Sequence, residues 1–475
     1  MATLAPAATS KWRRSIETWS LPAAWSIAAL FCLASLYIAS RRLFWTDEVA
    51  TTLATRLPDW ASVWRCGDLM PLAYLALARV FDQWFGPGEI GIRLPSVIAV
   101  SAGLLVTFDC ARRLSDRLHG LIALGALLCS FLPYYASEGR SYGLYFLCAA
   151  LALWTWLFSR RAPLIGIVFF VGTLLHFYMV LCLVPLAVAE ALEWRRWRAP
   201  SSKLVAAFLG SVAALGVLWP QVSHARNATV HFVWAEPSLT RLAGSYLTLF
   251  PLAPLLVALC LAGMALSSGK KATVLPMSPA ERVAWLSLLI PIAGFLAAEL
   301  VTNVFVERYL IGALPGVAVG LAFLVDRIDR EQFLFSIGLL LLLLAAGGWR
   351  VASATIHPAW ITQYGDYQGD VKAILHSEDE YWKDGKRFIV MPESKLFLPA
   401  RYYSSHSDRY VAIPGNPPLE TRYFPLPKWT DEELIQHARE TALVAPGPEL
   451  LQRLNQAGVR LILHKIYPST YYLER

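Results

Sequence analysis

Eleven apolar runs, separated by short polar segments, constrain this chain more than any other feature. A helix needs about twenty apolar residues to cross a bilayer, and somewhat fewer where the bilayer thins. Only 16% of the 475 residues are charged, whereas soluble proteins average about 25%. The pattern predicts an all-α polytopic membrane protein with about eleven transmembrane helices. The runs lie near 21–40, 92–111, 120–136, 142–159, 163–177, 178–194, 203–220, 243–267, 283–301, 309–325 and 333–350.

Clusters of arginine and lysine indicate which loops face the cytoplasm. They follow every second run, and basic residues concentrate in cytoplasmic loops. The N-terminus is therefore predicted to be cytoplasmic. The first run is followed by Arg-Arg-Leu-Phe-Trp rather than by a small-residue cleavage site, so it is predicted to remain as an anchor. The net charge of +8 falls in these loops and does not suggest a nucleic-acid partner. The clusters lie at 112–117, 160–161, 195–203, 270–271 and 327–330.

Residues 70–85 are apolar but short, and they contain Arg79 and Asp82. If this segment crossed the membrane, the basic cluster at 112–117 would lie outside, against the distribution of the other clusters. An amphipathic helix lying on the outer membrane surface fits better. The first outer loop, residues 41–91, is thus predicted to carry juxtamembrane helices.

The character of the chain changes after residue 350, where no apolar run reaches spanning length. An odd number of spans puts this segment outside the cytoplasm. Strands alternating with helices predict a small α/β extracytoplasmic domain at 351–475, after a transmembrane domain at 1–350. The predicted elements are buried strands at 388–391 and 459–463, a helix at 431–443 capped by Thr430, and a helix at 449–457.

Two adjacent acids, Asp47 and Glu48, follow the first span directly. Acid groups close to hydrocarbon are costly and tend to be functional. A solvated pair of loop acids is the alternative. A carboxylate is also a suitable general base for a hydroxyl nucleophile.

Arginines persist in the outer loops, interleaved with acids and aromatic residues. Arginine binds phosphate through its planar fork, and aromatic rings stack on sugar faces and anchor at the headgroup level. Together these residues predict a pocket for a lipid phosphate that carries a sugar. Simpler explanations stay open: Glu138 and Arg140 could form a loop ion pair, Arg308 could anchor a span end, and His176 could be a packed histidine.

Four segments, in order, resemble one known family. Asp47-Glu48 matches a first-loop Asp-Glu pair, and residues 67–74 resemble Asp-x-His-Pro-Pro-Leu-Tyr-Tyr. Arg93-Leu94-Pro95-Ser96 opens the next span, and residues 134–142 resemble Tyr-Tyr-Ser-Gln-Glu-Ala-Arg-x-Tyr. The family is the C-type-fold, lipid-phosphate-dependent glycosyltransferases, in the bacterial branch related to protein O-mannosyltransferases and to the lipid A aminoarabinose transferase. The resemblance covers roughly residues 20–350.

The chain departs from the family pattern at Leu69-Met70-Pro71, which replaces His-Pro-Pro, so any role of that histidine is vacant. Further along, the turn His176-Phe177-Tyr178 is similar to a Thr-His-Tyr turn of the family, and Glu307-Arg308-Tyr309-Leu310 is similar to its Arg-Tyr-Leu. Each motif alone is weak evidence. Their order, and their common location on the outer face, makes the resemblance more specific.

The resemblance implies transfer of a hexose or pentose from a polyprenyl-phosphate donor to an acceptor hydroxyl, at the outer face of the bacterial cytoplasmic membrane. Asp47 would be the base, with Glu48 as the other candidate. Arg140, Arg308 and Arg93 would bind the donor phosphate. The acceptor could be a glycan, a lipid or a protein, and a divalent metal stays open. The remaining pocket residues would be Asp68, Tyr74, Tyr135, Glu138, Tyr142, His176 and Tyr309.

Two other functions compete with this one. A transporter or flippase for a lipid-linked glycan would explain a charged, aromatic outer cavity without any chemistry. Transporters often show internal repeats and broken helices in matching positions, which the sequence does not reveal. A scaffold whose outer domain binds a partner would leave the acids and arginines beside the membrane unexplained.

Overall fold

The computed structural model divides the chain into two compact units. The helical unit comprises Met1–Ser40 and Gly67–Ile356, and the sheet unit comprises Arg41–Cys66 and His357–Arg475. Part of the first outer loop therefore groups with the C-terminal segment, which begins 291 positions after Cys66, at His357. The structure describes residues 6–65, 70–86, 88–193, 199–229, 235–267, 277–329, 333–357, 367–392, 396–413, 427–463 and 470–474.

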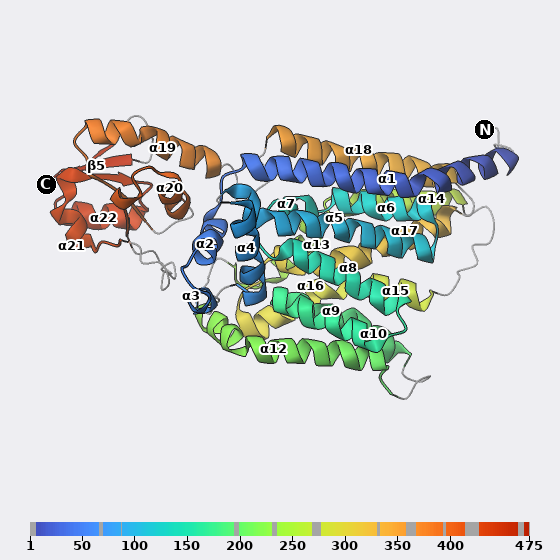
Figure 1. The fold of residues 1–475 in the computed structure, drawn as a ribbon. Coiled ribbons are helices and arrows are strands. Elements are labelled where there is room, and N and C mark those ends of the chain that lie inside the picture. The colour runs from blue at the N-terminus through green and yellow to red at the C-terminus, as the bar shows by residue number, and fades with distance from the viewer. Residues whose placement is uncertain are drawn as a thin grey trace. The chain divides into compact units, whose positions relative to one another are not determined.

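The described residues of the helical unit contain helices and turns but no strand (Figure 1). This follows from the long apolar runs, because a helix satisfies every backbone hydrogen bond within its own segment. The helices are α1 (Pro6–Arg41), α4 (Leu72–Phe85), α5 (Glu89–Leu114), α6 (Arg117–Cys129), α7 (Leu132–Ala136), α8 (Tyr142–Phe158), α9 (Ala162–Leu175), η1 (Phe177–Cys182), α10 (Leu183–Leu192), α12 (Ser202–Thr229), α13 (Leu239–Leu249), α14 (Ala253–Ser267), α15 (Pro279–Leu286), α16 (Leu289–Ala297), η3 (Ala298–Thr302), η4 (Glu307–Ala313), α17 (Leu314–Asp329) and α18 (Phe333–Ile356).

Among the described residues, five helices are long and apolar enough to cross a membrane, or up to seven segments if each of two bent helix pairs counts as one span. Four shorter apolar helices accompany them. Each of the eleven predicted runs overlaps one of these elements. The chain thus has the helices of a multi-pass membrane protein, while the number of crossings stays a prediction. The bent pairs are Leu239–Leu249 with Ala253–Ala262, and Pro279–Leu286 with Leu289–Thr302.

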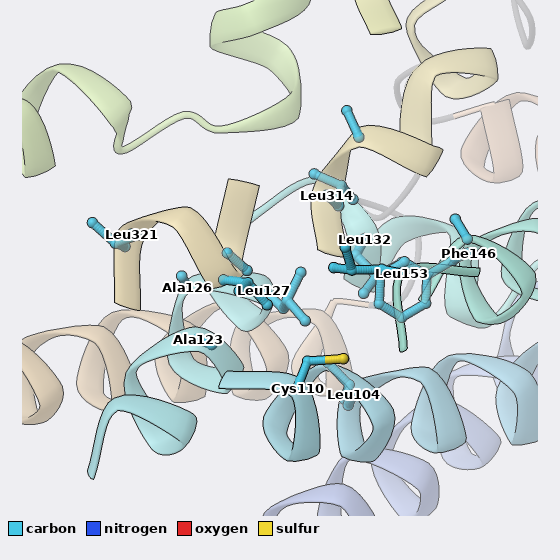
Figure 2. Close-up of a cluster of buried hydrophobic side chains, with 14 of the residues drawn as sticks. Leu104, Cys110, Ala123, Ala126, Leu127, Leu132, Phe146, Leu153, Leu314 and Leu321 are labelled. Atoms are coloured by element: carbon cyan, nitrogen blue, oxygen red, sulfur yellow. The ribbon is translucent and has the colours of Figure 1, made fainter. Parts of the chain in front are cut away.

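A continuous apolar core joins α5, α6, α8 and α17 (Figure 2). Leu104 of α5, Leu127 of α6, Phe146 of α8 and Leu314 of α17 are all buried in it. Close helix contact depends on small residues at such crossings. At Gly143 of α8 an added Cβ would lie 2.8 Å from the Ser96 carbonyl oxygen. The start of α8 is therefore held tightly against α5, next to the candidate site.

The predicted surface segment 70–85 forms α4, which is not among the candidate spans. Its Tyr74 is fully buried, and Trp84 near its end is exposed. Arg79 and Asp82, the two charged residues that argued against a span, are both buried. The helix is confirmed, and its position along the membrane surface stays a prediction.

The C-terminal part of the sheet unit contains a five-stranded sheet in the order β2-β1-β3-β5-β4. Strand β1 pairs parallel with β2 and β3, whereas β5 pairs antiparallel with β3 and β4. Val390, Leu443, Leu434 and Leu454 share one buried core beside the sheet. The strands are β1 (Phe388–Pro392), β2 (Tyr410–Ile413), β3 (Thr441–Val444), β4 (Arg460–Leu463) and β5 (Thr470–Glu474).

Helices α2 (Thr46–Thr55) and α3 (Trp60–Arg65) come from the first loop and belong to the sheet unit. The remaining helices of this unit follow residue 357. They are α19 (Tyr367–Lys383), α20 (Phe397–Tyr403), η6 (Ser407–Arg409), α21 (Asp431–Gln436), η7 (Ala438–Glu440) and α22 (Pro448–Gln456).

Several predicted elements after residue 350 are confirmed and two details are wrong. The strand at 388–391, the helix at 449–457 and the Thr430 cap are present. The predicted helix 431–443 ends at Gln436, and Thr441–Val444 forms a buried strand between β1 and β5, because its backbone pairs with both neighbours. The strand at 459–463 was predicted to be buried, but β4 is an edge strand and largely exposed.

Candidate functional site

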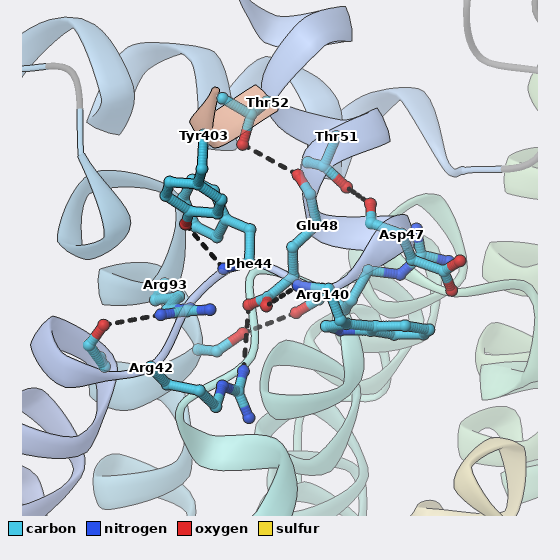
Figure 3. A network of polar contacts seen from close by, with 12 residues as sticks. Arg42, Phe44, Asp47, Glu48, Thr51, Thr52, Arg93, Arg140 and Tyr403 are labelled. Carbon is cyan, nitrogen blue, oxygen red and sulfur yellow. Dashed lines mark hydrogen bonds and ion pairs between the residues drawn. The ribbon is translucent and has the colours of Figure 1, made fainter. Parts of the chain in front are cut away.

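Arg93 and Ser96, from the Arg-Leu-Pro-Ser segment of α5, fix the backbone around the candidate site. Arg93 is fully buried and donates from Nη1 to the Ala39 carbonyl oxygen at 2.6 Å (Figure 3). Ser96 donates from Oγ to the carbonyl oxygen of Arg140 at 2.6 Å. This motif therefore connects the end of α1 and the loop before α8 to α5. Arg93, which was predicted to bind phosphate, has a structural contact here.

A cluster of aromatic rings joins the start of α8, the end of α9, η1 and η4. The His176 ring stacks on the Tyr145 ring, with centroids 4.6 Å apart and 10° between their planes. The rings of Tyr178 and Tyr309 also stack, at 4.7 Å. Tyr142 faces both His176 and Tyr309, at 5.5 Å and 6.3 Å. We call these five residues the tyrosine–histidine cluster.

His176 occupies the predicted turn, at the residue where α9 ends and before η1 begins. Its backbone is extended there, so the helix is broken and the ring points into the cluster. The backbone N–H of Tyr178 donates to His176 Nδ1 at 3.3 Å. A nitrogen that accepts carries no proton, so Nε2 is the nitrogen that can donate.

Arg308 borders this cluster from η4 and is only 4% exposed. Its guanidinium carbon lies over the rings of Tyr142 and Tyr309, at 5.8 Å and 5.7 Å from their centroids. Arg140 and Arg308 both interact electrostatically with His176. Two arginines thus act on one buried histidine, and guanidinium groups of this kind are suited to binding an anion.

The predicted acid pair lies on the first turn of α2, in the sheet unit. Glu48 is fully buried, and its Oε1 forms an ion pair with Arg42 Nη2 at 3.1 Å (Figure 3). Its other oxygen accepts the backbone N–H of Trp45 at 3.3 Å. Asp47 is only half-buried. Glu48 therefore holds the start of α2 together, and Asp47 is the acid that solvent can reach.

The structure gathers some of the other predicted pocket residues. The ring of Tyr135 lies 5.2 Å from that of Tyr142, edge to face. Glu138 is buried in the loop between α7 and α8, and Tyr74 is buried on α4. Asp68 lies outside the described residues. Among the described part of the chain, no group of three or more His, Cys, Asp or Glu residues could hold a metal ion.

Sequence reasoning missed Tyr145 and Arg42 as site-forming residues. Tyr145 lies three residues after Tyr142 on α8, so both face the same side of the helix. That spacing could have identified it. Arg42 belongs to the Arg-Arg-Leu-Phe-Trp segment before the acids, and nothing in the sequence distinguishes its partner Glu48 from Asp47.

No family model and no curated protein matches the sequence. Among solved structures, ArnT from Cupriavidus metallidurans in the apo state aligns with a TM-score of 0.60 and 13% identity, over 94% of this chain and 97% of that one. The same protein bound to undecaprenyl phosphate aligns with a TM-score of 0.58 and 13% identity, over 95% and 97%. An oligosaccharyltransferase from Archaeoglobus fulgidus aligns with a TM-score of only 0.41 and 14% identity, over 81% and 62%, which is too low to support an argument. This chain has the fold of ArnT over nearly its whole length.

Proposed function

We propose that this chain is an integral-membrane glycosyltransferase that takes its sugar from a polyprenyl-phosphate donor. The observation that carries the proposal is the shared fold with ArnT, one of whose structures is bound to undecaprenyl phosphate. The Asp47-Glu48, Arg-Leu-Pro-Ser and Tyr-Tyr…Tyr segments resemble the C-type glycosyltransferase family. The buried arginines and the tyrosine–histidine cluster supply chemistry that fits such a donor.

Donor binding is assigned to the helical unit. Arg140 and Arg308 would bind the lipid phosphate, because guanidinium groups form paired, charge-assisted hydrogen bonds with phosphate oxygens. His176 would add an N–H from Nε2, the nitrogen left free to donate. The rings of Tyr142 and Tyr309 would flank the sugar and the phosphate. Arg93 is the weakest of the three predicted phosphate ligands, because it already donates to the Ala39 carbonyl oxygen.

Proton transfer is assigned to Asp47. The acceptor oxygen attacks the anomeric carbon as its proton passes to the Asp47 carboxylate. The bond between the anomeric carbon and the phosphate oxygen breaks, and the lipid phosphate leaves with the electron pair. A single displacement inverts the anomeric centre. Glu48 is the less suitable base, since both of its oxygens are engaged within the loop.

A flippase for a lipid-linked glycan is the second function that the sequence allowed. In the part of the chain that the structure describes, two bent helix pairs are present, and they follow each other between Leu239 and Thr302. Inverted-repeat transporters place broken helices in corresponding positions of two halves instead. The fold similarity to ArnT gives the flippase no support.

A transfer assay separates the two functions. The full chain is reconstituted in proteoliposomes with undecaprenyl phosphate carrying a radiolabelled hexose or pentose. A glycolipid, an oligosaccharide and a serine- and threonine-rich peptide are offered as acceptors. We expect label to move from the lipid to one acceptor, with release of undecaprenyl phosphate. Label that crosses the bilayer still attached to its lipid would support the flippase and contradict the enzyme.

We further propose that the protein lies in the bacterial cytoplasmic membrane with its N-terminus inside and residues after 350 outside. Cysteine labelling in intact cells tests the orientation. Glu432 is exposed, so Glu432→Cys introduces a reactive thiol at the surface of this segment. In a chain that also carries Cys66→Ser, this thiol should react with an impermeant maleimide without permeabilisation. Labelling that requires permeabilisation would reverse the proposed orientation.

A further inference from the structure

Helix α2, which carries Asp47 and Glu48, is held by two consecutive tyrosines from α20. The backbone N–H of Phe44, two residues before α2, donates to Tyr403 Oη at 2.8 Å (Figure 3). At the other end of α2, Nη1 of its C-cap residue Arg56 donates to Tyr402 Oη at 2.9 Å. These contacts join residues 359 and 346 positions apart in the sequence. They lie within the sheet unit.

Aromatic and apolar packing reinforces both hydrogen bonds. The Phe44 ring lies 5.8 Å from the Tyr402 ring and 6.4 Å from the Tyr403 ring. Next to it, Trp45 is buried against Val371 of α19. A buried aromatic side chain contributes much of the energy of such a contact. The segment before α2 is thus anchored in the C-terminal part of the chain.

This anchor acts directly on the acid-bearing turn. Phe44 lies between Arg42 and Trp45, and both of these residues bind Glu48. Tyr403 therefore holds the middle of a short segment whose two ends are joined to Glu48. The backbone position of Asp47, one residue before Glu48, depends on the same segment.

We propose that Tyr403, with Tyr402, is a positioning residue that sets the orientation of Asp47 through the backbone of α2. The proposal rests on the proposed function and gives the C-terminal part of the sheet unit a role in the reaction. Neither tyrosine is required to touch the substrate. Small displacements of a reacting group lower the rate strongly, by up to about a hundredfold for 1 Å.

The test uses the full chain with Tyr403→Phe, Tyr402→Phe and the double substitution. Each change removes one hydroxyl and keeps the ring. We expect Tyr403→Phe to lower kcat roughly tenfold to a hundredfold with little change in the donor KM. Tyr402→Phe should have a smaller effect, because Arg56 is exposed. The matched control is Tyr472→Phe on strand β5, which removes the hydroxyl that donates to Asp384.

Hydrogen exchange of the α2 amides supplies a second readout that is independent of activity. Exchange should become faster in Tyr403→Phe and in the double variant, but not in Tyr472→Phe. Unchanged exchange in the double variant would overturn the inference while leaving the proposed function intact. Faster exchange with unchanged kcat would also overturn it. Absence of transfer by the unaltered chain would instead overturn the proposed function, and the positioning role with it.

Discussion

Arg42 of the sheet unit and Arg308 of the helical unit are both buried, and their surroundings differ. Arg42 of the sheet unit faces the carboxylate of Glu48, and neither side chain is exposed. Arg308 of the helical unit lies over the rings of Tyr142 and Tyr309. A carboxylate cancels the charge of an arginine, whereas a ring attracts the cation without carrying a net charge. The first arrangement suits a structural ion pair, and the second places two aromatic faces beside the guanidinium group.

The largest expected effect of a single change is at Asp47, the neighbour of the ion-paired Glu48. Asp47→Asn should lower turnover by roughly 10²–10⁴, the range for a lost general base, while undecaprenyl phosphate still binds. Asparagine keeps the shape but cannot take up a proton. Steady-state transfer and lipid binding are measured on the same preparation. Asp431→Asn, in an exposed ion pair with Arg453, is the control.

Normal transfer rates in Asp47→Asn and in folded Glu48→Gln would remove the first loop from the mechanism. If only Glu48→Gln is slow, the two acids exchange roles. Glu48 would then be the base, and Asp47 would not be.

The next largest effect concerns the ion pair itself. Arg42→Ala should cost about 3–5 kcal/mol of unfolding free energy, because it leaves a buried carboxylate without its partner. The double substitution Arg42→Met with Glu48→Leu should recover part of that loss. Arg453→Ala, which breaks an exposed pair with Asp431, should cost only about 0–1 kcal/mol. Chemical denaturation followed by tryptophan fluorescence compares these variants, and equal costs at Arg42 and Arg453 would refute a structural role for Arg42.

In the helical unit, the prediction for a buried arginine concerns ligand binding rather than stability. Arg308→Ala should weaken binding of undecaprenyl phosphate by about 1.5–3 kcal/mol, the range for a hydrogen bond to a charged group. Arg308→Lys should restore only part, since the planar fork is lost. Arg350→Ala is a matched control: this arginine also lies over a tyrosine ring, that of Tyr134, at 5.1 Å. Binding is measured in nanodiscs, and equal losses at both positions would mean that Arg308 has no special role.

The smallest effect is a pH dependence in the sheet unit. Burial raises the pKa of the Tyr410 hydroxyl above its ordinary value of about 10, and the hydrogen bond that this hydroxyl donates to Glu378 raises the pKa further. A raised pKa in the folded state gives stability that is present below pH 10 and lost as the pH rises above it. The difference in Tm between the unaltered chain and Tyr410→Phe should therefore shrink from pH 8 to pH 11. A constant difference would contradict the assignment.

The features that the sequence predicts well are local. Apolar run length locates every candidate span, because the bilayer demands one continuous apolar helix. Thr430 with Glu433 predicts a helix start from residues three apart, and both hydrogen bonds of that capping box are present. Three of the five members of the tyrosine–histidine cluster, Tyr142, His176 and Tyr309, were predicted as pocket residues, because they stand near the ends of predicted spans.

The features that the sequence could not predict depend on distant contacts. Thr441–Val444 is a strand only because β1 and β5 lie on either side of it. Glu48 is ion-paired only because Arg42 turns toward it. The grouping of α2 with α20 joins segments about 350 residues apart, and one sequence holds no local signal for such a pairing.

The central claim is that the helical unit binds a lipid phosphate at Arg308 and Arg140. A cryo-electron microscopy map of the full chain in nanodiscs with undecaprenyl phosphate tests it most directly. The account predicts phosphate density within hydrogen-bond distance of at least one of these guanidinium groups, beside the rings of Tyr142 and Tyr309. Phosphate density beyond hydrogen-bond distance of both guanidinium groups would contradict the account.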